Sequence, residues 1–343
     1  MKKVNIKTIS KMAGVSPAAV SFVLNNKGGV SEETRKRILD VVEREGYIPN
    51  INSRRLSMKR SFNLAIIMNE TYSLFTDAFA SDSMYSAVKR AAELNYQMLM
   101  LPVMNIDNQE SLSISVRQGN IDGAIVMHDL DALSFARLSD NGIPMVAIDS
   151  HMADPIYPCI KVDYEKGAYQ CTEYLINKGH SNIGYIGIGA LPDFYLSCQK
   201  GYMGALATAK LPIHPDWIVC VDVSGCPLQE ASRQIVAKRI SKDNCPSAFF
   251  CGNDLVAIGT INALADKGIR VPEDVSIISM DDISMARFFI PSLTTLHVNA
   301  DAMGVKAVDL LNDIIQKNEH KDVIFEELGP IIERDSVRDL LSN

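Results

Sequence analysis

The chain has 343 residues, which is enough for two or three domains of about 150 residues each. Its 47% hydrophobic and 22% charged residues are typical of a folded globular protein and exclude a long disordered or fibrous chain. Every apolar stretch is shorter than the roughly 18 residues of a membrane helix, and lysines interrupt the N-terminal segment. We therefore expect no signal peptide, no membrane contact and a cytoplasmic location.

The charged residues are unevenly distributed along the chain. Residues 1–60 contain thirteen Lys or Arg and five Asp or Glu, a net charge of +8, and the other 283 residues have a net charge of −15. The total of −7 therefore conceals a basic segment on an acidic body, which predicts that the basic end binds a polyanion. All seven cysteines lie in the acidic part without C-x-x-C spacing, which indicates reduced and mostly buried thiols.

The N-terminal part predicts three short helices. Apolar residues recur at helical spacing over 6–13, and Ser16 before a proline caps a second helix over 17–25. Ser31 caps a third helix over 32–46, which starts with two glutamates and ends at a glycine. Two helices joined by a short turn and followed by a third indicate a helix-turn-helix unit.

From residue 62 onward, short apolar runs alternate with longer helical stretches. The runs that predict buried parallel strands are 64–68, 97–101, 123–127, 145–148, 183–187, 218–221, 248–251 and 275–279. Helices are predicted between them, for example over 84–95, 167–178 and 255–267. This alternation predicts an α/β fold with doubly wound parallel sheets, and its length allows two lobes with a cleft between them.

A series of motifs extends in order over essentially the whole chain. In the N-terminal part and the linker after it, the motifs are Ile6-Lys-Thr-Ile-Ser-Lys-Met-Ala-Gly-Val-Ser, Val30-Ser-Glu-Glu-Thr-Arg, Gly46-Tyr-Ile-Pro-Asn and Arg54-Arg-Leu. In the body they include Gly142-Ile-Pro-Met-Val-Ala-Ile-Asp, Phe250-Cys-Gly-Asn-Asp-Leu-Val-Ala-Ile-Gly and Val271-Pro-Glu-Asp-Val-Ser. Together they resemble the lactose-repressor (LacI/GalR) family of bacterial transcription regulators.

The resemblance implies a helix-turn-helix DNA-binding domain at 1–46, a hinge at 47–60 and a two-lobed body like a periplasmic binding protein at 61–343. We place the N-lobe at about 61–162 plus 292–325 and the C-lobe at about 163–291 plus 326–343. The resemblance also implies a repressor that binds a pseudo-palindromic operator in double-stranded DNA as a homodimer, under the control of a small-molecule effector such as a sugar or sugar derivative. The chain ends without a leucine heptad extension, which favours a dimer over a tetramer.

The expected recognition helix offers few hydrogen-bond donors to DNA bases. Its exposed face is predicted to contain Pro17, Ala18, Ser21 and Phe22, with Ser16 and Asn25 placed to contact phosphates. Many members of the resembling family have arginine where this chain has Phe22, which donates no hydrogen bond. Its ring can pack on a thymine methyl group or, as the alternative, only cover the edge of the helix. We therefore expect specificity from methyl contacts and DNA shape. The alternative is a small helical bundle with a solvated basic face.

The linker contains the second predicted DNA contact. The resemblance implies a hinge helix in which Leu56 wedges between base pairs in the minor groove, beside contacts from Tyr47, Asn50, Ser53 and Arg54. The alternative is that Leu56 packs on the body. Because the linker has no continuous apolar face, we expect it to fold only when it binds DNA.

Polar residues follow several predicted strands, at the edge where open α/β sheets bind ligands. Asp149, Asn253 and Asp281 follow strands, and Tyr72 and Phe75 lie shortly after the first strand. Such a set suits a polyhydroxylated or amine-bearing ligand. The alternative is helix capping, and the resemblance favours ligand binding.

One position departs from the pattern of the resembling family. Many members have an arginine that binds the ligand where this chain has Cys198, and a cysteine cannot form that bidentate contact. Three alternatives remain open: an atypical effector, a contact from Lys200 instead, or no effector.

Catalytic and metal-binding motifs are missing from the sequence. The six histidines are scattered without H-E-x-x-H spacing, G-x-S-x-G is absent, and Pro192 occupies the third glycine position of a dinucleotide-like motif at 187–192. We therefore expect no enzyme, no metal and no cofactor. The alternative function is a small-molecule-binding protein of the periplasmic type without a role on DNA, which predicts a signal peptide and no basic head.

Overall fold

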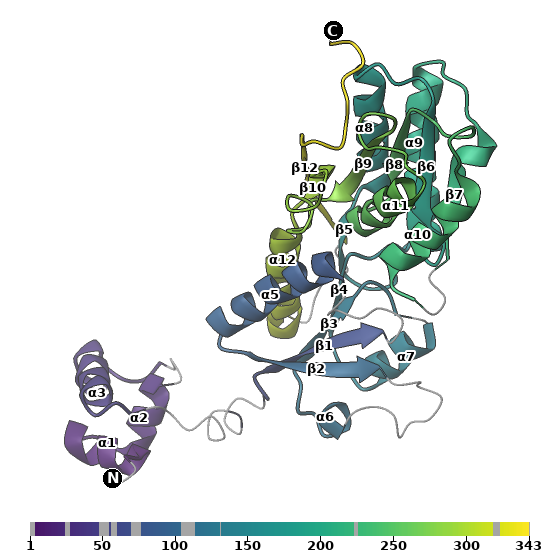
Figure 1. The fold of residues 1–343 in the computed structure, drawn as a ribbon. Helices are drawn as coiled ribbons and strands as arrows, with labels where there is room; N and C mark the ends of the chain where they lie inside the picture. Colours follow the sequence, from purple (N-terminus) through teal and green to yellow (C-terminus); the bar gives the residue numbers. More distant parts are fainter. Residues whose placement is uncertain are drawn as a thin grey trace. The chain divides into compact units, whose positions relative to one another are not determined.

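The computed structural model describes residues 4–24, 28–47, 55, 60–69, 77–103, 114–130, 132–222, 226–317 and 323–342 (Figure 1). The chain divides into two compact units, Met1–Phe62 and Asn63–Asn343, which we describe separately. Several predicted contacts lie outside the described residues and stay predictions, namely Asn25, Asn50, Ser53, Arg54, Leu56, Tyr72 and Phe75. Among the described residues, no helix is long and apolar enough to cross a membrane.

Three helices form the first unit, as predicted: α1 (Ile6–Ala13), α2 (Pro17–Leu24) and α3 (Glu32–Arg44). The side-chain oxygens of Asn5 and Ser31 cap α1 and α3, because they accept hydrogen bonds from backbone N–H groups of the first turn. Gly14 ends α1 with a φ of 65°, a left-handed conformation that glycine adopts without steric cost. The helices enclose a small apolar core made of Ile9, Ala13, Val20, Val23, Ile38 and Val41.

The first lobe of the second unit is built on a six-stranded parallel sheet (Figure 1). Its strands are, in spatial order, β11 (Val323–Glu326), β5 (Cys159–Val162), β4 (Met145–Ile148), β3 (Gly123–Met127), β1 (Asn63–Asn69) and β2 (Gln97–Val103). Helices α5 (Ala78–Glu93) and α12 (Ala300–Lys317) pack side by side on this sheet, and α6 (Ile114–Arg117) and α7 (Ala132–Asp140) complete the lobe. Strands β3 and β4 are buried along their whole length, as expected for parallel strands inside a sheet.

The second lobe has a sheet of its own. Its strands are, in spatial order, β12 (Leu328–Ile332), β10 (Thr294–Val298), β9 (Ser276–Asp281), β8 (Ala248–Cys251), β6 (Ile183–Ile188) and β7 (Ile218–Val221). Only β12 runs antiparallel to its neighbour among these strands. Helix α8 (Tyr164–Asn177) packs on α9 (Pro192–Thr208), and α10 (Leu228–Arg239) packs on α11 (Asp254–Asp266), while a 3-10 turn, η2 (Pro215–Trp217), precedes β7.

The chain passes between the two lobes three times, and a single residue separates the flanking elements each time. Asp163 lies between β5 and α8, Asn299 between β10 and α12, and Glu327 between β11 and β12. Asp163 and Asn299 also cap the helices that follow them, since each side chain accepts a hydrogen bond from a backbone N–H group at 3.0 Å.

The fold agrees with the predicted class, and all eight strands expected from apolar runs are present. The expected return to the first lobe at residue 292 is wrong, because β10 pairs with β9 and β12 in the second sheet. The chain re-enters the first lobe only at α12. All seven cysteines are free, and the four that are buried are Cys159, Cys171, Cys198 and Cys251.

Helices α8 and α9 approach each other closely at Gly201. A β-carbon there would lie 2.0 Å from the carbonyl oxygen of Glu165, whereas at Gly204 the nearest atom is Cδ2 of Tyr169 at 3.6 Å. We expect Gly201→Ala to lower the free energy of unfolding by about 1–3 kcal/mol because the helices must separate. Gly204→Ala is the matched control and should raise it by about 0.5–1 kcal/mol, because glycine loses more entropy in a helix than alanine. Urea denaturation followed by Trp217 fluorescence measures both, and equal effects would contradict the close approach.

Candidate functional site

Helix α2 buries one face and exposes the other. Val20 and Val23 are buried in the core of the first unit, whereas Pro17 and Ala18 are exposed and Phe22 has 42% of its surface exposed. The exposed face is therefore apolar, as the sequence predicted. A partner that covers the phenylalanine ring gains the free energy of removing apolar surface from water.

The other described residues that were predicted to contact DNA lie beside this face. Ser16 is exposed, and its Oγ accepts a hydrogen bond from the N–H group of Ala19 at 3.2 Å, so the side chain caps α2. Ser21 is half-buried, and Tyr47 packs against the core of the first unit. The contacts of Ser16, Ser21 and Tyr47 with DNA therefore stay predictions.

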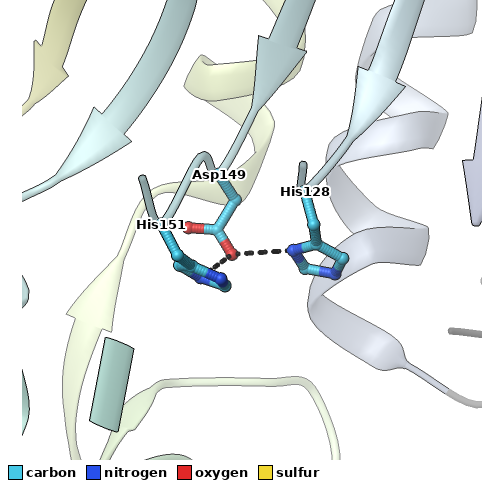
Figure 2. Close-up of side chains that lie close together, drawn as sticks. All are labelled: His128, Asp149 and His151. Carbon is cyan, nitrogen blue, oxygen red and sulfur yellow. Dashed lines mark ion pairs between the residues drawn. The ribbon is translucent and has the colours of Figure 1, made fainter. Parts of the chain in front are cut away.

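In the second unit, three side chains converge at the carboxyl ends of β3 and β4 (Figure 2). Residue Met127 of β3 pairs with Ile148 of β4, so the residues that follow, His128 and Asp149, lie next to each other. Both have left-handed backbones, with φ of 61° and 60°, which histidine and aspartate adopt more readily than most residues. His151 comes from the loop after β4.

Both imidazole rings face the same carboxylate oxygen of Asp149. Oδ2 of Asp149 lies 3.3 Å from Nδ1 of His128 and 3.2 Å from Nε2 of His151 (Figure 2). All three side chains are at least nine-tenths buried, with exposed fractions of 5%, 9% and 7% respectively. One nitrogen or oxygen from each of the three residues lies within 4.8 Å of the other two. This set of atoms could hold a metal ion.

Further polar groups hold this cluster in place. The hydroxyl group of Tyr164, the first residue of α8, donates a hydrogen bond to Oδ1 of Asp149. Oδ2 of Asp77 lies 3.8 Å from Nε2 of His128. Asp149 and His128 therefore each have a second partner that restricts the orientation of the side chain.

The cluster also packs against the second lobe. The ring of His151 lies 5.6 Å from the ring of Tyr164 and 5.1 Å from that of Phe194, measured between ring centroids. Tyr164 belongs to α8 and Phe194 to α9, and their own rings meet edge to face at 4.6 Å. The site thus lies where the first sheet faces helices of the other lobe.

Interactions within the cluster shift the pKa values of His128 and Asp149. Burial disfavours the charged form of His128, but Asp149 and Asp77 outweigh burial and raise the pKa of the imidazole to about 10. Burial also disfavours the charged form of Asp149, but His151 and His128 hold the pKa of this carboxyl well below its usual range. Asp149 is therefore ionised at neutral pH.

A second buried carboxylate belongs to Asp254, the first residue of α11, which follows strand β8 of the second sheet. Asp254 accepts hydrogen bonds from the hydroxyl of Thr295 at 2.7 Å, from the N–H group of Ile283 at 2.8 Å and from the hydroxyl of Ser279. Burial nevertheless raises the pKa of Asp254 to about 6.

Asp281, the last residue of β9, lies near the carboxylates of Asp254 and Asp149. Burial raises the pKa of Asp281 well above its usual range, and the charges of Asp254, Asp77 and Asp149 raise it further. Asp281 also has a left-handed backbone, with a φ of 114°. A carboxyl group that keeps its proton can donate a hydrogen bond to a ligand.

The predicted effector residues fall into three groups. Asp149 and Asp281 lie at the carboxyl ends of strands, where the sequence placed them. The Oδ1 atom of Asn253 accepts a hydrogen bond from a backbone N–H group of α11 at 2.9 Å, in agreement with the capping alternative. Cys198 is fully buried on α9, whereas Lys200 is exposed on the same helix, so the two do not share a face. Their roles in binding stay predictions.

Sequence reasoning missed His128, His151 and Tyr164. The histidines are scattered in the sequence, but they meet in the structure because β3 and β4 are neighbouring strands. The signal that could have identified them is position, since both lie within three residues of the end of a predicted strand. The same criterion identified Asp149.

Comparison with known proteins gives matches over the whole chain. Residues 5–50 match the family described as "Bacterial regulatory proteins, lacI family", and residues 172–337 match a "Periplasmic binding protein-like domain". The probable HTH-type transcriptional repressor ExuR of Bacillus subtilis (strain 168) is 30% identical over 98% of this chain and 99% of its own length.

Two solved structures have a similar fold. One is the lac repressor dimer bound to operator and the anti-inducer ONPF, with a TM-score of 0.76 and 22% identity over 98% of this chain and 100% of that chain. The other is a complex of the transcriptional regulator CelR with cellobiose, with a TM-score of 0.71 and 21% identity over 97% of this chain and 99% of that chain.

The raised pKa of Asp254 predicts a pH-dependent stability. Its pKa is about 6 in the folded protein against 3.8 when unperturbed, so the folded state binds this proton more tightly. The resulting stabilisation is complete below about pH 4 and is lost as the pH rises through about 6. We expect the stability of Asp254→Asn relative to the unsubstituted protein to improve by roughly 1–3 kcal/mol between pH 4.5 and pH 7.5.

Urea denaturation at the two pH values measures this difference. Asp274→Asn is the control, because Arg270 holds the pKa of Asp274 at about 2 and its ionisation is complete across this pH range. A stability difference for Asp254→Asn that is the same at both pH values would contradict the prediction.

Proposed function

Because the chain belongs to the LacI family of bacterial regulatory proteins, we propose that it represses transcription by binding a pseudo-palindromic operator as a homodimer, under the control of a small molecule bound beside Asp149. The chain is a DNA-binding transcriptional regulator, and its relatives are transcriptional repressors rather than enzymes. The observation that best supports the proposal is the helix-turn-helix unit, which exposes the apolar face of α2.

The charge of the head supports DNA binding. Residues 1–60 have a net charge of +8, so phosphate contacts provide much of the affinity and make it depend strongly on salt. Phe22, Pro17 and Ala18 offer apolar surface to thymine methyl groups in the major groove. A small-molecule-binding protein without a role on DNA is the alternative, and it leaves this basic head without a function.

An exposed apolar segment in the second lobe supports the dimer. Met285, Phe288 and Ile290, between β9 and β10, have 55%, 73% and 88% of their surfaces exposed. Three large apolar side chains within six residues are costly in water and are typical of a surface that another chain covers. The similar lac repressor structure is a dimer bound to operator.

The polar groups around Asp149 support a polyhydroxylated effector. Asp149 is ionised and accepts hydrogen bonds, whereas burial raises the pKa of Asp281 and so favours its protonated form, which donates one. The rings of Tyr164 and Phe194 add apolar surface beside these groups, as in most small-molecule sites. The similar CelR structure contains a disaccharide, cellobiose, and we propose a sugar or sugar derivative for this chain.

Selection of bound sequences from a random DNA library tests the function, with and without the small-molecule fraction of a cell extract. We expect the full-length protein to enrich a pseudo-palindrome, and the extract to change the amount of DNA retained. Failure to enrich any palindrome would overturn the proposal of operator binding. An enriched palindrome whose retention never responds to extracts or to a sugar panel would overturn effector control alone.

Phe22→Ala should weaken binding to the selected operator about five- to tenfold, because one apolar contact of roughly 1 kcal/mol is lost. Leu39→Ala is the control, since Leu39 has a similar exposed fraction, 45%, on the neighbouring helix α3. Fluorescence anisotropy with labelled operator measures both affinities. An unchanged affinity and sequence preference for Phe22→Ala would exclude a direct base contact by the ring.

Phe288→Asp should raise the dissociation constant of the dimer about 30-fold or more, because a charge would enter an apolar interface at a cost of about 2 kcal/mol. Phe325→Asp is the control, since Phe325 is 58% exposed on the edge strand β11. Sedimentation velocity measures the two equilibria. A dimer that tolerates Phe288→Asp as well as Phe325→Asp would place the interface elsewhere.

A further inference from the structure

The cluster of His128, Asp149 and His151 has the donor atoms of a metal site. Two imidazole nitrogens and one carboxylate oxygen are ligands that divalent ions such as Zn²⁺ prefer in proteins. The two distances from Oδ2 of Asp149 to the histidine nitrogens are 3.3 Å and 3.2 Å. Ligand bonds of about 2.0–2.1 Å in a tetrahedron place neighbouring ligand atoms about 3.3 Å apart, which these two distances match. The two histidine nitrogens lie within 4.8 Å of each other and would move together around an ion.

The surroundings of the cluster match those of metal ligands. A histidine that binds a metal through one ring nitrogen commonly has a carboxylate beside the other nitrogen, and Asp77 lies 3.8 Å from Nε2 of His128. A ligating carboxylate is itself commonly held by a hydrogen bond, and the hydroxyl of Tyr164 donates one to Oδ1 of Asp149. Asp77 thus faces the nitrogen of His128 that the ion does not use, and Tyr164 holds the other oxygen of Asp149.

The described residues leave one nitrogen of this cluster without a hydrogen-bond partner. Nδ1 of His151 is buried and has no hydrogen-bond partner among the described residues, although the side chain is only 7% exposed. The two imidazoles approach the same oxygen and stack at a centroid distance of 5.4 Å, so two protonated rings would repel each other.

We propose that Nδ1 of His128, Nε2 of His151 and Oδ2 of Asp149 bind a divalent first-row transition metal ion, for which Zn²⁺ is the probe. The ion displaces the proton that Asp149 and Asp77 hold on His128, and it then meets two lone pairs and the negative charge of Asp149. Three protein ligands leave at least one coordination position for water or for an oxygen atom of a small molecule in the cleft. The metal site does not depend on the proposed effector, because all three ligands come from the chain itself.

Titration of the metal-free, full-length protein with ZnCl₂ by calorimetry tests the proposal. Because protons compete with the ion for the imidazole nitrogens, the titration is performed at about pH 8. We expect one high-affinity ion per chain, and a loss of affinity of about 100-fold in His128→Gln and in His151→Gln. Tyr164→Phe should lose about 10- to 100-fold, because the carboxylate is no longer held in orientation.

His297→Gln is the matched control, because Nδ1 of His297 lies 3.0 Å from Asp282 in a histidine–aspartate pair that has no third ligand among the described residues. We expect this variant to bind Zn²⁺ like the unsubstituted protein. Zn²⁺ binding that is absent, or that is unchanged in both His128→Gln and His151→Gln, would overturn the proposal.

The visible spectrum of the Co²⁺-loaded protein gives a second test that needs no variant to fold. Nitrogen and oxygen ligands give only weak d–d bands, whereas a thiolate ligand adds an intense charge-transfer band in the near ultraviolet. Cys220 is exposed and is the competing ligand that such a band would indicate. Weak d–d bands alone support the site, and an intense thiolate band or no d–d bands would overturn it.

Discussion

The ionised carboxylate of Asp149 imposes the strongest constraint on the second unit, because a buried charge without partners is very costly. Its partners come from three segments: His128 after β3, His151 in the loop after β4, and Tyr164 at the start of α8. Two of these segments belong to the first lobe and one to the second. The two histidines of the first lobe compensate the charge, and Tyr164 of the second lobe adds a hydrogen bond. The cluster is therefore one of the contacts that link the two lobes.

The fold was predictable where single segments determine it. Strands such as β3 and β4 are continuous apolar runs because helices cover both faces of their sheet, and such runs are visible in any sequence. The edge strand β11 was not predicted, since it exposes Val323 and Phe325 and has no such run. The lobe assignment of β10 failed for another reason: its partners β9 and β12 are defined by pairing between distant segments, which local patterns do not contain.

The same distinction applies to the site. Asp149 and Asp281 were predictable because each ends a strand, and polar residues at such ends meet in the fold. His128 and Asp149 are in contact because β3 and β4 are neighbouring strands in a particular register. The local sequence around either residue does not contain this information. The positions of Cys198 and Lys200 follow from helical geometry, which turns one into the core and the other outward. The exposed face of α2 was predictable because helical spacing alone separates Val20 and Val23 from Pro17, Ala18 and Phe22.

The three crossings between the lobes limit how the second unit can deform. Asp163, Asn299 and Glu327 each span a crossing alone, and the first two are fixed as helix caps. Connections this short leave little freedom for the lobes to slide past each other, so we expect relative motion to be a rotation about the crossings. In a rotation, displacement grows with distance from the axis. A rotation of a few degrees would therefore move the parts of the lobes farthest from the crossings the most, and it would change the contact between His151 of the first lobe and Phe194 of the second.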